Sequence, residues 1–335
     1  MSTLKDVAKA AGVSSATVSR YLTGHARLSD ETRADVERAI RELNYRPNRV
    51  ARRLQATGGR SGLLGLVIPD MRNPFFTDIG HGVEDAAQQH GYTVILGHSN
   101  DSPEREALYL DLFHAEHVDG IVLPTVRPVS ATIKDLSRGD IPVVCVDRKT
   151  AAEVDTVISD NVQGARLATE HLLALGHRRI GFVGGLPGIS TTQERLAGYR
   201  EALAAAGVPF RAELTADGDS RQDGGRERAG RLLDLADPPT ALLGGNNLTT
   251  LGALQAIRER KLRIPDDVAI VGYDDMPWAS AFNPPLTAID QSGYEMGQHA
   301  AALLMRRIEA PDMPPETSVL RPRLVVRGSC GATTG

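Results

Sequence analysis

Polar and aromatic residues recur directly after the apolar runs of the chain, where each run gives way to a loop. They supply carboxylates, guanidinium groups, amides and phenyl rings, and we take nine as candidate ligand contacts: Asn73, Phe75, Phe76, Asp147, Arg148, Arg195, Asn246, Asp274 and Gln291. Phenyl faces stack on the C–H side of a sugar ring, whereas carboxylates, Arg forks and amides bond neighbouring hydroxyls in pairs. The residue types therefore indicate a site for a small polyhydroxylated molecule.

Some of these residues also have purely structural interpretations. Asn73 precedes Pro74 and suits a turn, Phe76 suits the core equally well, and Asp274 with Arg195 could be an ion pair. Trp278, the only tryptophan, follows the same region, but the sequence does not decide whether it lines the site.

The runs that precede these residues read as buried strands, and amphipathic stretches between them read as helices. The strands are LLGLVIP, YTVILG, GIVLPT, PVVCVD, RIGFVGG, TALLGGN and VAIVGYD, and the helical stretches are 77–90, 104–117, 161–175, 192–206, 223–236 and 247–260. This alternation predicts an α/β core with doubly wound parallel sheets, whose ligands bind at the carboxyl ends of the strands. The strands form two groups, and TAIDQ and SVLRPRLVVR are expected to complete them.

The predicted organisation has three parts. A helix-turn-helix head occupies 1–46, a hinge helix and linker 47–60, and a two-lobed core 61–335. Lobe 1 is expected to span about 61–159 and 290–319, and lobe 2 about 160–289 and 320–331.

The charge distribution sets the head apart from the core. Residues 1–60 hold twelve Lys and Arg against six Asp and Glu, so 26 basic and 36 acidic residues remain of the total 38 and 42. A basic head on an acidic body is typical of a DNA-binding module joined to a sensing or catalytic one.

The head reads as three short helices. Thr3 is a candidate cap for a helix from Leu4, Ser14 for one over 15–22, and Ser29 or Asp30 for one that ends near Leu43. Gly12 permits the turn between the first two, which predicts a helix-turn-helix unit whose second helix enters the major groove.

TLKDVAKAAGVSSATVSRYL and LSDETRADVERAIRELNYRPNRVARRL resemble the head of the lactose repressor/purine repressor family almost without gaps. The resemblance implies base contacts at the start of the second helix, phosphate contacts after the third, and a hinge helix in the minor groove whose Leu54 wedges between base pairs. The implied DNA-binding residues are Thr3, Ser14, Ser15, Ala16, Thr17, Arg20, Asn44, Tyr45, Asn48, Arg49, Val50, Ala51 and Leu54.

The core resembles the same family and the periplasmic sugar-binding proteins, and the nine candidate contacts match motif positions of ribose-type pockets. One position departs, because DGDSRQ places Ser220 where such pockets tend to carry an aromatic wall. The resemblance implies a monosaccharide such as ribose or a related aldose as effector; since the family also contains purine binders, a purine remains the alternative.

Other chemistries have weak support. Cys145 and Cys330 form no disulfide pattern, no apolar run is long enough for a bilayer span, and no secretory signal is visible, so we expect a cytoplasmic protein without membrane contact. His114 and His117 lack a third ligand, GGLPG lacks nucleotide-binding spacing, and no nucleophilic motif occurs. We therefore expect no metal, no cofactor and no enzymatic activity.

The favoured hypothesis is a homodimeric transcription regulator, in the first instance a repressor, that binds a pseudo-palindromic double-stranded operator and is controlled allosterically by its effector. The C-terminus carries no leucine heptads, so a dimer rather than a tetramer is expected. Two alternatives remain: a sugar-processing enzyme, which would need Asp147 or Asp274 as acid or base, and an architectural DNA-binding protein that uses only the minor-groove wedge.

Overall fold

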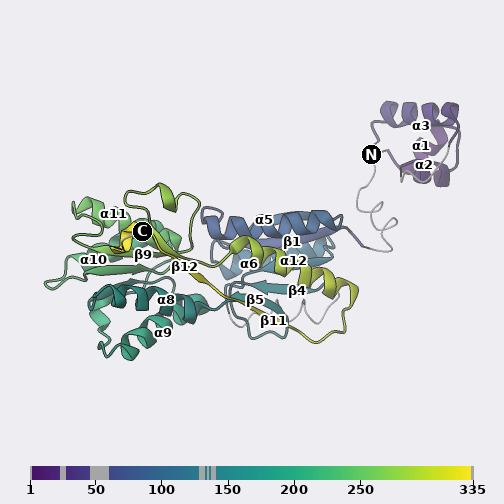
Figure 1. Ribbon diagram of the computed structural model, residues 1–335. Helices are drawn as coiled ribbons and strands as arrows, with labels where there is room; N and C mark the ends of the chain where they lie inside the picture. Colours follow the sequence, from purple (N-terminus) through teal and green to yellow (C-terminus); the bar gives the residue numbers. More distant parts are fainter. Residues whose placement is uncertain are drawn as a thin grey trace. The chain divides into compact units, whose positions relative to one another are not determined.

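The computed structural model describes residues 2–22, 28–45, 60–127, 133, 136 and 141–332. These residues divide into two compact units, Met1–Gly62 and Leu63–Gly335 (Figure 1). Within the described ranges, no helix combines the length and the apolar composition needed to cross a membrane.

The first unit is a three-helix head made of α1 (Leu4–Ala10), α2 (Ser15–Leu22) and α3 (Asp30–Glu42). Each helix begins where the sequence supplies a cap. Thr3 and Asp6 form a reciprocal capping box, and Ser29 accepts from the Thr32 N–H. Such caps satisfy backbone donors that would otherwise lack partners, each contributing about 1 kcal/mol. The predicted helix bounds are thus confirmed.

One small apolar cluster holds the head together. Val7 and Ala8 of α1, Val18 of α2, and Val36 and Ala39 of α3 are buried against one another. The helical spacing of these residues puts them on inward faces, which is why three helices too short to be stable alone form one unit.

The second unit contains two six-stranded sheets, in the orders β11-β5-β4-β3-β1-β2 and β12-β10-β9-β8-β6-β7. Neighbouring strands are parallel except β10 and β12. The first sheet comprises β1 (Leu63–Ile68), β2 (Thr93–His98), β3 (Gly120–Leu123), β4 (Val143–Val146), β5 (Asp155–Ser159) and β11 (Thr317–Leu320). The second comprises β6 (Ile180–Val183), β7 (Thr215–Ala216), β8 (Ala241–Gly244), β9 (Ala269–Tyr273), β10 (Thr287–Asp290) and β12 (Arg323–Val325). Of these, β5 and β7 were not among the strands expected from sequence.

Helices cover both faces of each sheet, as Figure 1 shows. The first lobe carries α5 (Pro74–Gln89), α6 (Pro103–Ala115) and α12 (Gly293–Glu309), and the second carries α8 (Asn161–Ala174), α9 (Ser190–Ala205), α10 (Gln222–Leu233) and α11 (Asn247–Glu259). Short 3₁₀ turns lie at Ala212–Leu214, Ala279–Ala281 and Gly328–Cys330. A sheet buried on both faces needs strands that are apolar throughout, and β3, β4, β6, β8 and β9 are fully buried.

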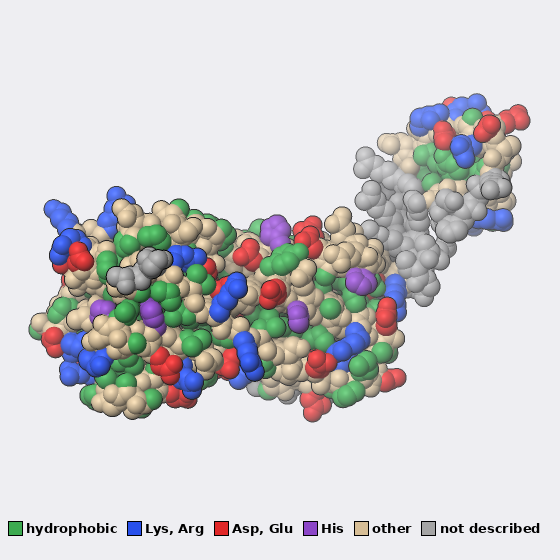
Figure 2. Space-filling view, in the orientation of Figure 1, with side chains coloured by type: hydrophobic (Ala, Val, Ile, Leu, Met, Phe, Trp, Pro, Cys, Tyr) green, Lys and Arg blue, Asp and Glu red, His purple; other side chains and the backbone are tan. Residues whose placement is uncertain are grey.

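Within the described residues the chain passes between the lobes three times, after β5, after β10 and between β11 and β12. TAIDQ contributes β10 to the second sheet, and SVLRPRLVVR contributes β11 to the first sheet and β12 to the second, so these segments complete both sheets as expected. On the visible face of the core, acidic and basic side chains are interspersed (Figure 2).

Candidate functional site

A cleft lies at the carboxyl ends of the strands, and its empty space, open solvent included, is about 580 Å³. Both lobes contribute to its lining, which matches the rule that open α/β sheets bind ligands at this edge. Eight of the nine candidate contacts line it: Asn73, Phe75, Phe76, Asp147, Arg148, Arg195, Asn246 and Asp274.

Charged side chains at the end of β4 form the wall of the cleft from lobe 1. Arg148 Nη1 lies 2.8 Å from Asp101 Oδ1, and Arg148 Nε lies 3.7 Å from Asp147 Oδ2. The Oδ1 atom of Asp147 is buried without a hydrogen-bond partner among the described residues. Burial raises the pKa of Asp147 to about 6, although Arg148 and Arg195 oppose the rise. An acceptor without a donor is costly to bury, so this carboxylate is prepared for a donor from a ligand.

The wall from lobe 2 is a fixed guanidinium. Arg195 donates from Nε to Asn161 Oδ1 (2.8 Å), from Nη1 to the Gly245 carbonyl (2.6 Å) and from Nη2 to Gln291 Oε1 (3.2 Å). Its guanidinium carbon also lies 3.8 Å from the centre of the Tyr273 ring. These contacts fix the plane of the guanidinium, which preorganises it for ligand hydroxyls.

Gln291 is the one candidate contact outside the lining of this cleft. It donates from Nε2 to Asp274 Oδ1 while it accepts from Arg195, so it bridges two lining residues. Asp274 accepts in addition from the Asn247 N–H at 3.3 Å. Burial raises the pKa of Asp274, whereas Arg195 and these hydrogen bonds oppose the rise. Gln291 therefore holds other side chains in position.

The aromatic part of the cleft comes from the first turn of α5. Asn73 caps this helix by accepting from the Phe75 N–H at 3.0 Å, and Pro74 occupies the first helical position. Phe75 and Phe76 pack edge to face, 5.3 Å between ring centres, and both are buried in the lobe 1 core while they line the cleft. Phe76 is thus core and pocket at once, and Asn73 combines capping with lining.

The structure adds lining residues that sequence reasoning missed, among them Asp70, Asp101, Thr192 and Arg221. Asp70 and Asp101 follow β1 and β2, so the strand-end signal used for the other residues was present for them too. Ser220 also lines the cleft, and its Oγ accepts from the Leu186 N–H at 3.1 Å. The hydroxyl therefore supports a neighbouring loop where related pockets carry a ring. Trp278 is 43 % exposed and lies outside the lining.

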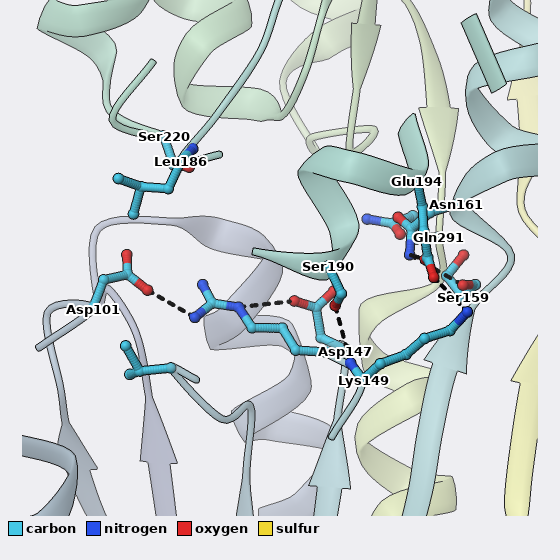
Figure 3. Close-up of polar contacts among 12 residues, drawn as sticks. Asp101, Asp147, Lys149, Ser159, Asn161, Leu186, Ser190, Glu194, Ser220 and Gln291 are labelled. Carbon is cyan, nitrogen blue, oxygen red and sulfur yellow. Dashed lines mark hydrogen bonds and ion pairs between the residues drawn. The ribbon is translucent and has the colours of Figure 1, made fainter. Parts of the chain in front are cut away.

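Hydrogen bonds cross the cleft between the lobes. Asn247 Nδ2 donates to Asn73 Oδ1 at 2.7 Å, and Arg221 Nη2 donates to Asn100 Oδ1 at 2.8 Å. A third crossing joins the Lys149 N–H to Ser190 Oγ at 3.0 Å. Figure 3 shows the region of this third crossing beside Asp147.

In the head, the candidate DNA contacts lie at both ends of the helices. Ser15, Ala16 and Thr17 form the first turn of α2, and Arg20 is exposed one turn further on. Two hydroxyl groups already take part in caps, because Thr3 bonds with Asp6, and Ser14 Oγ accepts from the Thr17 N–H at 3.1 Å. Of the candidates on α2, Ala16 and Arg20 are exposed to solvent and could contact DNA.

Past α3, Asn44 is exposed with a left-handed backbone (φ 45°), and Tyr45 is half-buried against the head's core. The predicted hinge helix with Asn48, Arg49, Val50, Ala51 and Leu54 lies outside the described residues. Among the residues that are described, no three His, Cys, Asp or Glu side chains are close enough together to hold a metal ion.

Two family models together match most of the chain. Residues 3–48 match the model of bacterial regulatory proteins of the lacI family, and residues 61–323 match that of the periplasmic binding proteins and sugar-binding domain of the LacI family. The chain belongs to the LacI family of bacterial transcriptional regulators. The resemblance of the head and core, and the predicted fold class, are thereby confirmed.

Similarity to individual LacI-family proteins extends over the full length. The chain is 35% identical to the HTH-type transcriptional repressor PurR of Mannheimia succiniciproducens, covering 98% of each chain. It is 36% identical to the ribose operon repressor of Halalkalibacterium halodurans, covering 98% of this chain and 96% of the relative. These relatives are repressors rather than enzymes, so this LacI-family chain is a DNA-binding regulator and the enzyme alternative is excluded.

Solved structures of the LacI family agree with the fold. The transcriptional regulator CelR in complex with cellobiose superposes with a TM-score of 0.75 at 35% identity, covering 98% of this chain and all of the other. The lac repressor dimer bound to operator and the anti-inducer ONPF gives 0.82 at 30% identity, covering 99% of both.

Proposed function

We propose that this LacI-family regulator is a repressor that binds a pseudo-palindromic operator as a homodimer and is controlled by an uncharged monosaccharide, such as ribose or a related aldose. The assignment of a sugar effector rests on the environment of the Asp147 carboxylate. It is buried, its Oδ1 lacks a hydrogen-bond donor, and it lies in a cleft with two phenyl rings and the fixed Arg195 guanidinium. A sugar supplies both the missing hydroxyl donors and an apolar C–H face.

The charges that line the cleft favour an uncharged ligand over a phosphorylated one. Four carboxylates face three guanidinium groups there: Asp70, Asp101, Asp147 and Asp274 against Arg148, Arg195 and Arg221. Asp101 already pairs with Arg148, and each nitrogen of the Arg195 guanidinium donates one hydrogen bond to a protein acceptor. A phosphate would meet net negative charge. A hydroxyl group can both donate to Asp147 Oδ1 and accept from Arg148 Nε or Nη1, buried atoms that lack a hydrogen-bond partner among the described residues.

The names of relatives support a sugar without specifying it. A ribose operon repressor and a cellobiose-bound regulator are among the similar proteins, as is a PurR repressor. A flat purine ring gains most from aromatic faces on both sides. Here Phe75 and Phe76 come from one lobe, and Ser220 stands at the aromatic position of related pockets. This asymmetry favours a monosaccharide.

For DNA, we propose that the first turn of α2 and Arg20 read base edges in the major groove, while the ends of the helices contact phosphates. The residues assigned to this role are Thr3, Ser14, Ser15, Ala16, Thr17, Arg20, Asn44 and Tyr45, together with Asn48, Arg49, Val50, Ala51 and Leu54 of the hinge. Two heads would read two half-sites, which requires the dimer that the lac repressor structure names for that protein.

A thermal-shift series on purified protein tests the effector. Ribose, other free aldoses, ribose 5-phosphate, cellobiose and purine bases are titrated separately, because a ligand of the native state raises the melting temperature by mass action. A saturable rise with a free aldose and none with the phosphate supports the proposal. A rise with purines alone, or with the phosphorylated sugar alone, contradicts it.

A gel-shift titration tests the DNA part independently of the ligand. Duplex fragments from the region upstream of the protein's own gene are compared with a scrambled duplex of equal composition. Specific retention of the native fragment, lost when one half-site is scrambled, supports a dimer on a pseudo-palindrome. Equal retention of both fragments argues against it.

A further inference from the structure

On one flank of the cleft an ion pair joins the lobes and connects to a residue of the binding wall. Lys149 follows Arg148 in lobe 1, and its ammonium group pairs with the Glu194 carboxylate of α9 in lobe 2. The Lys149 N–H also donates to Ser190 Oγ at 3.0 Å, at the first residue of the same helix. Figure 3 shows the Lys149 side chain extending from beside Asp147 toward Glu194 and Asn161.

Glu194 also contacts a buried residue. Its second oxygen, Oε2, accepts from Asn161 Nδ2 at 3.3 Å, and Asn161 Oδ1 accepts from Arg195 Nε at 2.8 Å. Asn161 is 1 % exposed and follows Ser159 and Asp160, where the chain passes from the sheet of lobe 1 into α8 of lobe 2. A continuous path of polar contacts therefore runs from Lys149 to the guanidinium in the cleft.

The orientation of the Asn161 amide depends on this carboxylate. Its Nδ2 donates to Glu194 Oε2 and, at 3.1 Å, to the Ser159 carbonyl, so both donor contacts direct Oδ1 toward Arg195. An amide turned the other way would present its NH₂ group to a guanidinium, which has no acceptor. The Glu194 side chain is 17% exposed and that of Lys149 58%, so solvent weakens their ion pair but does not remove it.

We propose that Glu194 is a positioning residue for effector binding. Together with Lys149 it forms an interlobe bridge, which keeps the segment carrying Asp147 and Arg148 aligned with Arg195. This inference rests on the proposed role of the cleft as the effector site. It adds a residue that does not line the cleft and links ligand affinity to the alignment of the lobes.

Three variants separate the two functions of Glu194. Lys149→Met and Glu194→Gln remove the ion pair, but glutamine keeps an oxygen that accepts from Asn161. Glu194→Ala removes both contacts. Ribose, or whichever probe sugar stabilises the wild type most, is titrated calorimetrically into each protein. Lys149→Met and Glu194→Gln are expected to weaken binding about 2- to 5-fold, and the double variant no further, because both remove one interaction. Glu194→Ala is expected to weaken binding more than Glu194→Gln.

Glu170→Gln is the matched control. Glu170 pairs with Arg166 at 3.3 Å within α8, so its ion pair stays inside one lobe. The Glu170→Gln variant is expected to bind the sugar with the same affinity as the wild type. Additive losses in the double variant, unchanged affinity in Lys149→Met, or tighter binding in any bridge variant would each overturn the inference.

Hydrogen exchange of the ligand-free protein tests the interlobe bridge independently of sugar binding. Hydrogen exchange of the ligand-free full chain is followed by mass spectrometry in peptides of lobe 2 around 190–195 and 245–247. Lys149→Met is expected to speed exchange there, although the substitution is in lobe 1, and Glu170→Gln is not. Unchanged exchange in lobe 2 overturns the bridge. Absence of sugar binding by the wild type would instead defeat the proposed function.

Discussion

Asp147 and Asp274 occupy equivalent positions in the two lobes. Asp147 follows β4, the third strand counted from the edge strand β11. Asp274 follows β9, the third strand counted from the edge strand β12. Both have left-handed backbones, with φ of 65° and 66°, a conformation that Asp tolerates better than most residues. Both carboxylates are buried, and both line the same cleft. The two lobes thus present matched acceptors to whatever binds between them.

The Asp147 carboxylate is expected to cost stability at neutral pH. Burial raises its pKa from 3.8 to about 6, so the folded state disfavours the ionised form. The preference of the folded state for the protonated Asp147 adds fully to the free energy of unfolding below pH 3.8. This contribution is lost as the pH rises through 6. Ligand-free Asp147→Asn should therefore melt above the wild type at pH 7 to 8, and this difference should vanish near pH 4.

Melting curves of the two proteins from pH 4 to 8 check this expectation, and Asp111→Asn at an exposed position of α6 controls for a general charge effect. A variant that melts below the wild type at pH 8 would show that the carboxylate is favourably paired. With the probe sugar, Asp147→Asn should bind about 10-fold more weakly or worse, because the amide presents one acceptor instead of two.

Arg221 is expected to contribute to ligand affinity from the opposite flank of the cleft. It lines the cleft and donates across it to Asn100 Oδ1 at 2.8 Å. Arg221→Met removes this interlobe contact and should weaken sugar binding about 2- to 5-fold. Arg221 is the N-cap residue of α10, and Arg226→Met within that helix is the control, since Arg226 pairs with Glu259 within lobe 2. Equal affinities of both variants and the wild type in calorimetry would contradict the expectation.

The close contact of α5 and α12 is expected to tolerate no side chain at Gly297. A Cβ there would lie 2.1 Å from the Ile79 carbonyl oxygen, and backbone cannot move aside as a flexible side chain does. Gly297→Ala should lower the free energy of unfolding by about 1–3 kcal/mol. Denaturant unfolding measures this loss. Gly188→Ala is the control, because a Cβ at that exposed glycine meets no atom within 4 Å; a Gly297 variant as stable as this control would contradict the packing argument.

Arg20 is expected to carry base recognition by the head. Its side chain is exposed on α2, where a bidentate contact with guanine discriminates by about 1–3 kcal/mol. Arg20→Met should therefore lower the preference for operator over scrambled duplex about 5- to 150-fold in competition gel shifts, while sugar affinity stays unchanged. Lys9→Met, in the last turn of α1, serves as a charge-matched control. If the two variants lose operator preference equally, Arg20 contributes only through its charge.

The sequence by itself determined the kinds of elements and their limits. Apolar runs, caps such as Thr3 and Ser29, and helical spacing are local signals, so the head helices and most strands were predicted close to their observed bounds. The short β7, the strand over 155–159 and the helix α12 were not among the predicted elements. Eight of the nine proposed contacts line the cleft. Most of them follow a strand end, because parallel strands bring their carboxyl ends to one edge, whereas Arg195 lies within α9.

Only the tertiary structure decided which polar residues face one another. Arg221 meets Asn100 across 121 positions of sequence, and Asn247 meets Asn73 across 174, distances over which no local pattern carries information. Gln291 shared the strand-end signal but supports Arg195 and Asp274 instead of lining the cleft. The path from Lys149 to Arg195 likewise depends on the passage of the chain between lobes. Such contacts arise from the packing of elements far apart in the chain, which the sequence specifies only through the whole fold.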